Sequence, residues 1–298
     1  MTLNDTHCHF FSARFFEALD REKNRDRPIG VQALAEQLGW EATADPEALA
    51  DRWVVELDEH KVARAALMAS VAGDEESVAS AVRRHPDRFV GFFALNAAAP
   101  DAPERAERAF ASQGLRCACL FPAMHHYSFR DACVLKVFEA AARHGGVVFG
   151  HCGYLSIEAR TKLGLPNLFD LRFGDPLALA ATAAHFPSVP VIVPHFGAGF
   201  FQEALMAAEV CPSIHLDTSS SNAWLRYFPG LTLAEVFRRT LTLLGPDRLL
   251  FGTDSSFFPR GWRRVIYGAQ RTALNEIGVE SDNSEKIFGG NFDRIFTA

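Results

Sequence analysis

Eight short apolar runs, separated by longer amphipathic segments, constrain the fold of this chain more than any other feature of its sequence. The first run ends at Asp5-Thr6-His7, and the others cover residues 64–68, 89–95, 117–121, 147–150, 189–193, 214–217 and 249–252. Near-continuous apolar strands are typical of a parallel sheet buried on both faces, because parallel strands need crossover helices that cover them. The alternation therefore predicts an α/β fold.

Eight β/α units in one chain predict a (β/α)8 TIM barrel. Helical patterning predicts intervening helices at residues 75–84, 131–143, 176–185, 202–210 and 233–243. The chain has 298 residues, of which 48% are hydrophobic, so it can fill one large barrel, and we expect a single domain over residues 1–298. The alternative is a doubly wound open sheet, because the closure of a barrel is invisible in a sequence.

Two connections, after the first and after the fifth strand, are longer than a β/α unit needs. Both leave the carboxyl ends of strands, where barrel enzymes form their active sites. These insertions are candidates for a substrate lid, and extra peripheral helices are an equally good interpretation. Residues 282–296 predict a closing helical extension at the C-terminus.

Histidines and one aspartate stand at the ends of four of the predicted strands. His7 and His9 lie two residues apart at the end of the first strand, so both imidazoles project from one face. His151 ends the fifth run, His195 ends the sixth, and Asp254 follows the eighth. Such groups are costly to bury unless they are paired or bind a metal. The five positions therefore predict one converging metal site at the barrel mouth.

Other polar residues near the predicted mouth are weaker candidates. Asp217 and the serines at 219–221 follow the seventh strand and could line the pocket. His125, His126 and Tyr154 follow the fourth and fifth strands, where a solvated loop residue is an equally good interpretation.

Five phenylalanines lie just beyond the proposed ligands and would suit a planar or aromatic substrate, although core packing explains much of this abundance. They are Phe10, Phe11, Phe196, Phe257 and Phe258.

Cysteines are expected to be buried thiols, because all six stand at irregular positions, several within apolar runs. Cys8 and Cys152 should pack against the helix layer, since neighbouring strand residues face opposite ways. His215, inside the seventh strand, is expected to be structural.

Several segments that carry the site residues resemble the amidohydrolase superfamily, in its amidohydrolase-2 branch related to aminocarboxymuconate-semialdehyde decarboxylase. The resemblance covers nearly the whole chain. It depends on Asp5-Thr6-His7-Cys8-His9, Gly150-His151, Pro194-His195-Phe196-Gly197-Ala198-Gly199, Phe251-Gly252-Thr253-Asp254 and Ile287-Phe288-Gly289-Gly290-Asn291.

The resemblance implies that His7, His9, His151 and Asp254 ligate one divalent metal ion, with zinc expected and manganese as the alternative. It also implies that His195 stands beside the ion as an acid/base or polarising group. On physical grounds, Asp254 could accept a proton from a metal-bound water. Binuclear members of the superfamily carry a bridging lysine on the fourth strand, and residues 117–121 contain no lysine, so we expect a single ion. Relatives of this branch imply a homodimer.

Two reactions fit such a site, and a third interpretation is not enzymatic. We prefer hydrolysis, in which a metal-activated water attacks a carbonyl or lactone of a small carboxylated or aromatic substrate. The alternative is a metal-dependent non-oxidative decarboxylase (carboxy-lyase) or hydratase of aromatic or ring-cleavage carboxylates. A catalytically inactive metal-binding protein is disfavoured because all five site residues are retained.

A carboxylated substrate would need an arginine near the metal to hold its anion. Five arginines lie in candidate mouth loops, and the sequence does not distinguish among them. They are Arg14, Arg160, Arg172, Arg226 and Arg260.

Charge and hydropathy exclude two classes of partner. The net charge of -6 argues against a nucleic-acid surface, which would need a basic stripe. No apolar run approaches the roughly 20 residues that cross a bilayer, and the N-terminus lacks a signal core. We therefore expect a cytoplasmic protein that acts on a small molecule.

Overall fold

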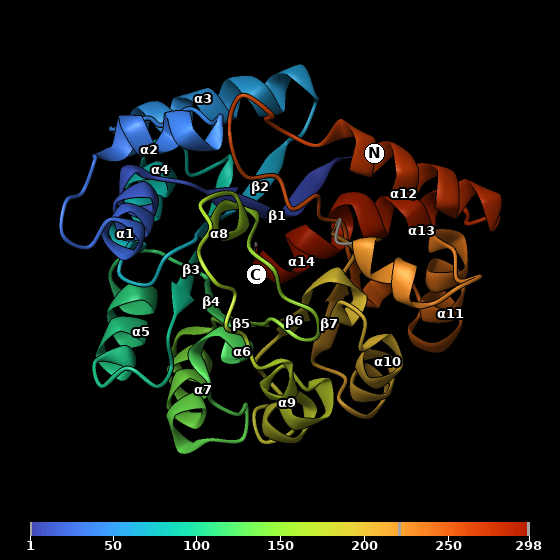
Figure 1. Ribbon diagram of the computed structural model, residues 1–298. Coiled ribbons are helices and arrows are strands. Elements are labelled where there is room, and N and C mark those ends of the chain that lie inside the picture. Colours follow the sequence, from blue (N-terminus) through green and yellow to red (C-terminus); the bar gives the residue numbers. More distant parts are fainter. Residues whose placement is uncertain (1, 220–221, 297–298) are drawn as a thin grey trace.

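A computed structural model describes residues 2–219 and 222–296 and contains eight parallel strands, each hydrogen-bonded to the next in chain order (Figure 1). The strands are β1 (Asn4–Phe10), β2 (Arg64–Ala69), β3 (Phe89–Leu95), β4 (Cys117–Leu120), β5 (Val147–Gly150), β6 (Val191–Val193), β7 (Ile214–Asp217) and β8 (Leu249–Leu250). The segment that follows β8 returns to β1: the amide of Thr6 donates to the carbonyl of Phe251 at 2.9 Å. The predicted (β/α)8 barrel is confirmed, and the open-sheet alternative is excluded because its strand order would differ.

Helices surround the strands on the outside of the barrel (Figure 1). The described part of the chain contains the helices α1 (Ala13–Lys23), α2 (Val31–Leu38), α3 (Pro46–Glu59), α4 (Glu75–Arg84), α5 (Ala102–Ala111), α6 (Pro122–His125), α7 (Ala132–His144), α8 (Glu158–Lys162), α9 (Pro176–Ala183), α10 (Phe201–Val210), α11 (Leu233–Leu244), α12 (Arg264–Glu276), α13 (Ser281–Glu285) and α14 (Asn291–Phe296). Residue types that favour a helix start mark the first turns of α3 and α9. In each, an aspartate accepts a hydrogen bond from the first turn and a proline occupies the first helical position.

The barrel interior is filled by apolar side chains from alternate positions of the strands, among them Met68, Phe92 and Phe149. Phe292 and Phe296 of α14 belong to the same cluster, and Figure 1 shows this helix at the centre of the ring. The C-terminal extension therefore packs into one end of the barrel and leaves the opposite end for a site.

A second apolar layer lies between the strands and the surrounding helices. Cys8 and Cys152 are fully buried in this layer, as the alternation of strand residues predicts. All six cysteines are free thiols.

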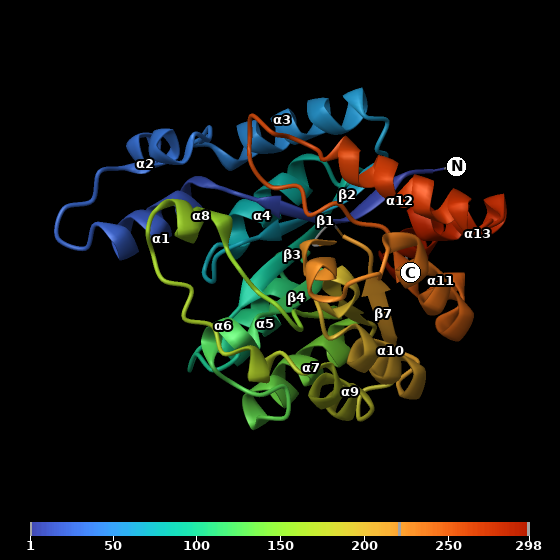
Figure 2. The ribbon, with the colours of Figure 1, turned by 45° about the vertical axis from the view of Figure 1, so that its right-hand side comes forward.

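Two insertions meet over the carboxyl ends of the strands. The first, residues 11–63, contains α1, α2 and α3, and the second, residues 151–175, contains α8. Arg160 of α8 makes two hydrogen bonds to the Glu22 carboxylate of α1, at 2.6 and 2.7 Å. Figure 2 shows α8 beside α1, to the left of the strands. The two insertions are thus tied to each other as well as to the barrel.

Among the described residues, no helix combines the length and the apolar character that crossing a membrane requires.

Stability should depend on pH through His215, which is buried within β7 as the sequence predicts. Burial, together with the nearby charge of Arg248, lowers the pKa of His215 from 6.5 to about 4. Because the folded-state pKa lies below the unfolded value, the unfolded chain takes up the proton first as the pH falls. Stability is therefore lost between about pH 6.5 and pH 4, by about 3 kcal/mol for this group.

We expect His215→Gln to flatten the fall in unfolding free energy over this pH range, as measured by urea denaturation. His185→Gln, on the surface at the end of α9, is the matched control and should keep the wild-type slope. Equal slopes for the two variants would contradict the prediction.

Candidate active site

The irregular pairing of β1 aims two histidines at one point. Asp5 pairs with Ala65 and Cys8 with Leu67, so β1 accommodates one extra residue beside His7. Such bulges occur next to active sites, where they redirect side chains. The Nε2 atoms of His7 and His9 lie 3.7 and 3.1 Å from the same carboxylate oxygen, Asp254 Oδ1.

Hydrogen bonds behind these two imidazoles determine which nitrogen faces the site. His7 Nδ1 lies 2.6 Å from the Asp217 carboxylate, so it donates, and in the neutral ring Nε2 is left unprotonated. His9 Nδ1 lies 2.7 Å from Ser70 Oγ, whose own proton goes to the carbonyl of Met68. Ser70 must therefore accept, and His9 likewise presents a lone pair on Nε2. This arrangement behind the ring is typical of metal-ligating histidines.

Asp254 completes a compact group of potential ligand atoms. One atom each from His7, His9 and Asp254 lie within 4.8 Å of one another. Burial alone would raise the pKa of the Asp254 carboxyl; when protons rather than a metal ion occupy the histidine Nε2 atoms, the hydrogen bond from His9 and the histidine charges hold that pKa well below its usual range. Two imidazole lone pairs and a carboxylate that face one another repel unless a cation lies between them. The donor set therefore fits one divalent ion.

His151 lies close to this group without belonging to it. It follows β5 and is buried, and its ring stacks on Phe121 at 5.5 Å between centroids. Its Nδ1 has no hydrogen-bond partner among the described residues. Burial and the neighbouring histidines lower its pKa well below 6.5, so the ring is neutral. A neutral buried imidazole is rarely left without a hydrogen-bond partner, and a role of His151 as an additional metal ligand would explain this one.

His195 faces the same space from the end of β6. Its ring lies 5.0 Å from that of His7 and 5.4 Å from that of His151, between centroids. Its backbone φ of +56° lies in the left-handed region, which residues other than glycine adopt rarely and mainly where the surroundings enforce it. Burial and the nearby His7 lower its pKa below 6.5.

Gly252 allows the parts of the site to approach closely. A Cβ atom at this position would lie 2.7 Å from Asp217 Oδ1 and 3.0 Å from the Cβ atoms of His7 and Ser219. Any larger residue would therefore push β1, β7 and the segment after β8 apart. The glycine of Phe251-Gly252-Thr253-Asp254 is required by this packing.

A pocket of about 520 Å³ opens above these groups. His7, His9, His151, His195 and Asp254 all line it, so the structure brings the five predicted residues to one cavity. Its walls include six aromatic side chains: Phe11, Phe15, Trp40, Phe121, Tyr154 and Phe257.

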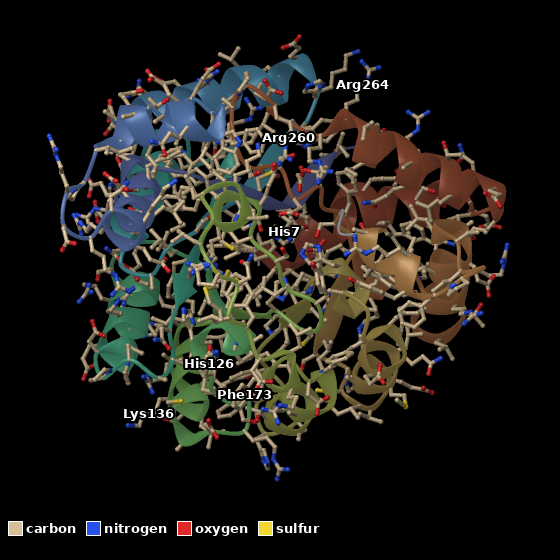
Figure 3. All side chains as sticks on the ribbon, in the orientation of Figure 1. His7, His126, Lys136, Phe173, Arg260 and Arg264 are labelled. Atoms are coloured by element: carbon tan, nitrogen blue, oxygen red, sulfur yellow. The ribbon has the colours of Figure 1, made fainter. Side chains whose placement is uncertain are left out.

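Of the weaker candidates that follow the fourth and fifth strands, two line the pocket and one does not. His125 and Tyr154 line the pocket. His126 instead hydrogen-bonds the carbonyl of Leu168, and Figure 3 shows it beside Phe173, away from His7.

Only some of the predicted serines and phenylalanines lie at or next to the pocket. Asp217 and Ser219 lie behind His7, and Ser220 and Ser221 fall outside the described residues. Phe11 and Phe257 line the pocket. The other three phenylalanines, at 10, 196 and 258, are buried in the core.

Of the five candidate arginines, within the described ranges, Arg260 alone lines the pocket. Arg160 is bound to Glu22 and Arg172 to Asp170. Figure 3 shows Arg260 between His7 and the helices at the rim.

Sequence reasoning missed Ser70, Trp40 and Glu158, which also line the pocket. Ser70 follows directly after the second apolar run, and that position was a usable signal. Trp40 and Glu158 lie in the insertions, where no periodic pattern marks a residue as facing the site.

A barrel with histidines and an aspartate at the carboxyl ends of its strands defines a class of metal-dependent barrel enzymes. The family model described as amidohydrolase matches residues 4–297. The chain belongs to the amidohydrolase family, as the sequence resemblance implies, and we conclude that it is a metal-dependent enzyme. No curated protein matches it.

Solved structures share the fold at low sequence identity. The 5-carboxyvanillate decarboxylase of Sphingomonas paucimobilis has a TM-score of 0.66 at 16% identity, covering 99% of both chains. A dihydroxybenzoic acid decarboxylase of Polaromonas, with bound manganese and 2-nitroresorcinol, has a TM-score of 0.65 at 18% identity, covering 99% of this chain and 97% of that one. A probable 2-pyrone-4,6-dicarboxylic acid hydrolase of Acinetobacter baumannii has a TM-score of 0.65 at 16% identity, covering 100% of both chains.

The contribution of His151 to metal binding can be separated from general effects on the pocket. His125 is the matched control, because it also lines the pocket and its Nδ1 also lacks a partner in the described part of the chain. If His151 is a ligand, His151→Ala should weaken Zn²⁺ or Mn²⁺ binding by at least about 10-fold, since even outer partners of a ligand contribute that much. Competition titration against a chelator measures the effect. Equal affinities for His151→Ala and His125→Ala would remove His151 from the ligand set.

Proposed function

We propose that this enzyme is a metal-dependent carboxy-lyase that removes carbon dioxide from a small planar carboxylate, with its acid group on an aromatic or unsaturated ring. The observation that carries the proposal is the lining of the pocket, which combines four imidazoles and a carboxylate with six aromatic side chains. The proposed ligands are His7, His9, His151 and Asp254, with His195 beside them.

The aromatic walls favour a flat substrate. Phe11 stacks on Phe15 at 3.9 Å between ring centroids, and Trp40 stacks on Phe257 at 4.2 Å. Stacked rings present extended apolar faces that a second planar system can contact over its whole surface. Pockets of this kind bind the body of a ligand by apolar contact and orient it with a few polar groups.

Arg260 is the group that we assign to the substrate anion. Its guanidinium lies 4.2 Å over the Phe257 ring and donates to Ser256 Oγ, which holds it at the pocket wall. Burial lowers the pKa of Arg260, but guanidinium groups stay charged under all ordinary conditions. The planar group has five N–H donors, so it can bind a carboxylate or phenolate oxygen while keeping its present contact.

Decarboxylation requires one proton for each carbon dioxide released. The bond between the ring carbon and the carboxylate breaks, its electron pair stays with the ring carbon, and a proton is added there. A divalent ion, when bound, would supply positive charge that stabilises the electrons delocalised over the ring. We assign the proton to His195, whose imidazole can take one up from solvent and pass it to the ring carbon, whereas the Asp254 carboxyl is held ionised. Asp254 then contributes fixed negative charge and hydrogen-bond acceptance.

Hydrolysis of a cyclic ester is the second candidate, favoured by the similarity to the probable pyrone dicarboxylate hydrolase. The same walls would bind a planar lactone. His195 or Asp254 would then accept a proton from the attacking water, and His195 would deliver none to carbon.

Isotopic labelling distinguishes the two reactions. We expect the metal-loaded enzyme, screened against hydroxybenzoates and pyrone carboxylates, to release carbon dioxide and, in D₂O, to place one deuterium on the carbon that carried the carboxylate. His195→Asn should reduce turnover by about 100-fold or more, as loss of a general acid does. Incorporation of ¹⁸O from labelled water into a product carboxylate, without carbon dioxide, would establish hydrolysis instead.

Arg260→Gln should raise KM for the carboxylated substrate by about 10- to 100-fold, because a hydrogen bond to a charged group contributes about 1.5–3 kcal/mol. Steady-state kinetics measure the effect. Arg172→Gln removes the same charge from an arginine outside the pocket and should leave KM unchanged. An unchanged KM in Arg260→Gln would exclude this residue as the anion-binding group.

A further inference from the structure

A single buried hydroxyl connects the proposed acid/base residue with the proposed metal site. Ser219 follows β7 and is fully buried. Its Oγ lies 2.8 Å from His195 Nδ1, 2.9 Å from Asp217 Oδ2 and 3.0 Å from His7 Nδ1. The hydroxyl has one proton to share among these three neighbours.

The Asp217 carboxylate takes that proton. An ionised carboxylate only accepts hydrogen bonds, and the Ser219 hydroxyl is one of its donors, together with the Ser219 amide at 2.6 Å and His7 Nδ1. With its proton directed to Asp217, the hydroxyl has only lone pairs left for His195. His195 Nδ1 must therefore carry a proton and donate it.

A second acceptor points to the same tautomer. The backbone carbonyl of Ser219 lies 3.3 Å from His195 Nδ1. A carbonyl oxygen beside an unprotonated nitrogen would be repulsive, whereas both Ser219 oxygens are satisfied by one N–H group. Nε2 of His195 is then left unprotonated, on the ring that lines the pocket.

We infer that Ser219 is a positioning residue that holds His195 in the Nδ1–H tautomer, so that Nε2 is the nitrogen that can take up a proton and deliver it to the substrate. The Asp217–Ser219 pair serves both histidines, because the same carboxylate also fixes the tautomer of His7. The catalytic consequence depends on the proposed function, whereas the tautomer itself does not.

The adjacent Thr218 provides a matched control. It is also fully buried, but its hydroxyl donates to Gln270 Oε1 at 2.6 Å and so serves a different network. Thr218→Val removes a buried hydroxyl from the same strand end with almost no change in shape. Ser219→Ala removes the hydroxyl that contacts His195.

Nitrogen-15 NMR of histidine-labelled, zinc-loaded full-length enzyme reads the tautomer directly, with the His195 signals assigned from the His195→Asn spectrum. We expect wild type and Thr218→Val to show a protonated Nδ1 and an unprotonated Nε2 at His195. Ser219→Ala should shift both signals toward an average of the two tautomers. Unchanged His195 signals in Ser219→Ala would overturn the inference, whether or not a substrate has been found.

A double-mutant cycle tests the catalytic consequence. Ser219→Ala should lower kcat by about 10- to 100-fold with KM changed less than about 3-fold, whereas Thr218→Val should retain kcat. On a His195→Asn background, Ser219→Ala should have no further effect, because residues that act as one unit are not additive. A further loss on that background, or weakened zinc binding with an unchanged tautomer, would show that Ser219 acts through His7 instead.

If no substrate is turned over by wild type, the proposed function fails while the tautomer measurement still stands.

Discussion

The junction between β1 and the segment after β8 is the constraint on which the site depends. The amide of Asp254 donates to the carbonyl of His7 at 2.9 Å, so closure of the barrel sets these two residues side by side. Gly252 lets Asp217 and Ser219 approach the same point, since a Cβ there would collide with three neighbours. Residues from both ends of the chain thus become adjacent through backbone hydrogen bonds, before any metal ion contributes.

Buried polar groups beside the junction hold the backbone in an unfavourable conformation. Asp254 has a φ of +57°, and such left-handed residues cost about 1–3 kcal/mol each. The Asp5 carboxylate accepts hydrogen bonds from the Thr253 hydroxyl at 2.5 Å and from Trp262 Nε1 at 2.7 Å, which fixes the residue just before Asp254. Burial raises the pKa of Asp5 to about 6 despite these bonds, so keeping this carboxylate ionised in the interior costs free energy. The site is therefore rigid because the surrounding fold stabilises it.

Sequence reasoning succeeded where a periodic pattern coincides with a physical requirement. The eight apolar runs predicted the strands, and their ends predicted His7, His151 and His195 as pocket residues, because parallel strands expose their carboxyl ends on one side. It could not select Arg260 from five loop arginines, since that choice depends on how a loop folds back. Nor could it assign Ser219, whose importance follows from distances to residues far away in the chain.

Chemistry and substrate choice come from different parts of this chain. The acid/base and ligand residues stand at strand ends, where the barrel geometry fixes them. The aromatic wall comes largely from the insertions and the segment after β8, through Phe15, Trp40 and Phe257. These segments are joined by the Arg160–Glu22 ion pair and by Lys162, which lies 5.5 Å from the Trp40 ring. They also share a buried apolar cluster, which includes Phe16, Leu34 and Ala159 and is separate from the cluster that fills the barrel. Substitutions in this cluster can therefore reshape the wall while the strand ends keep their positions, so one reaction can be directed to different rings.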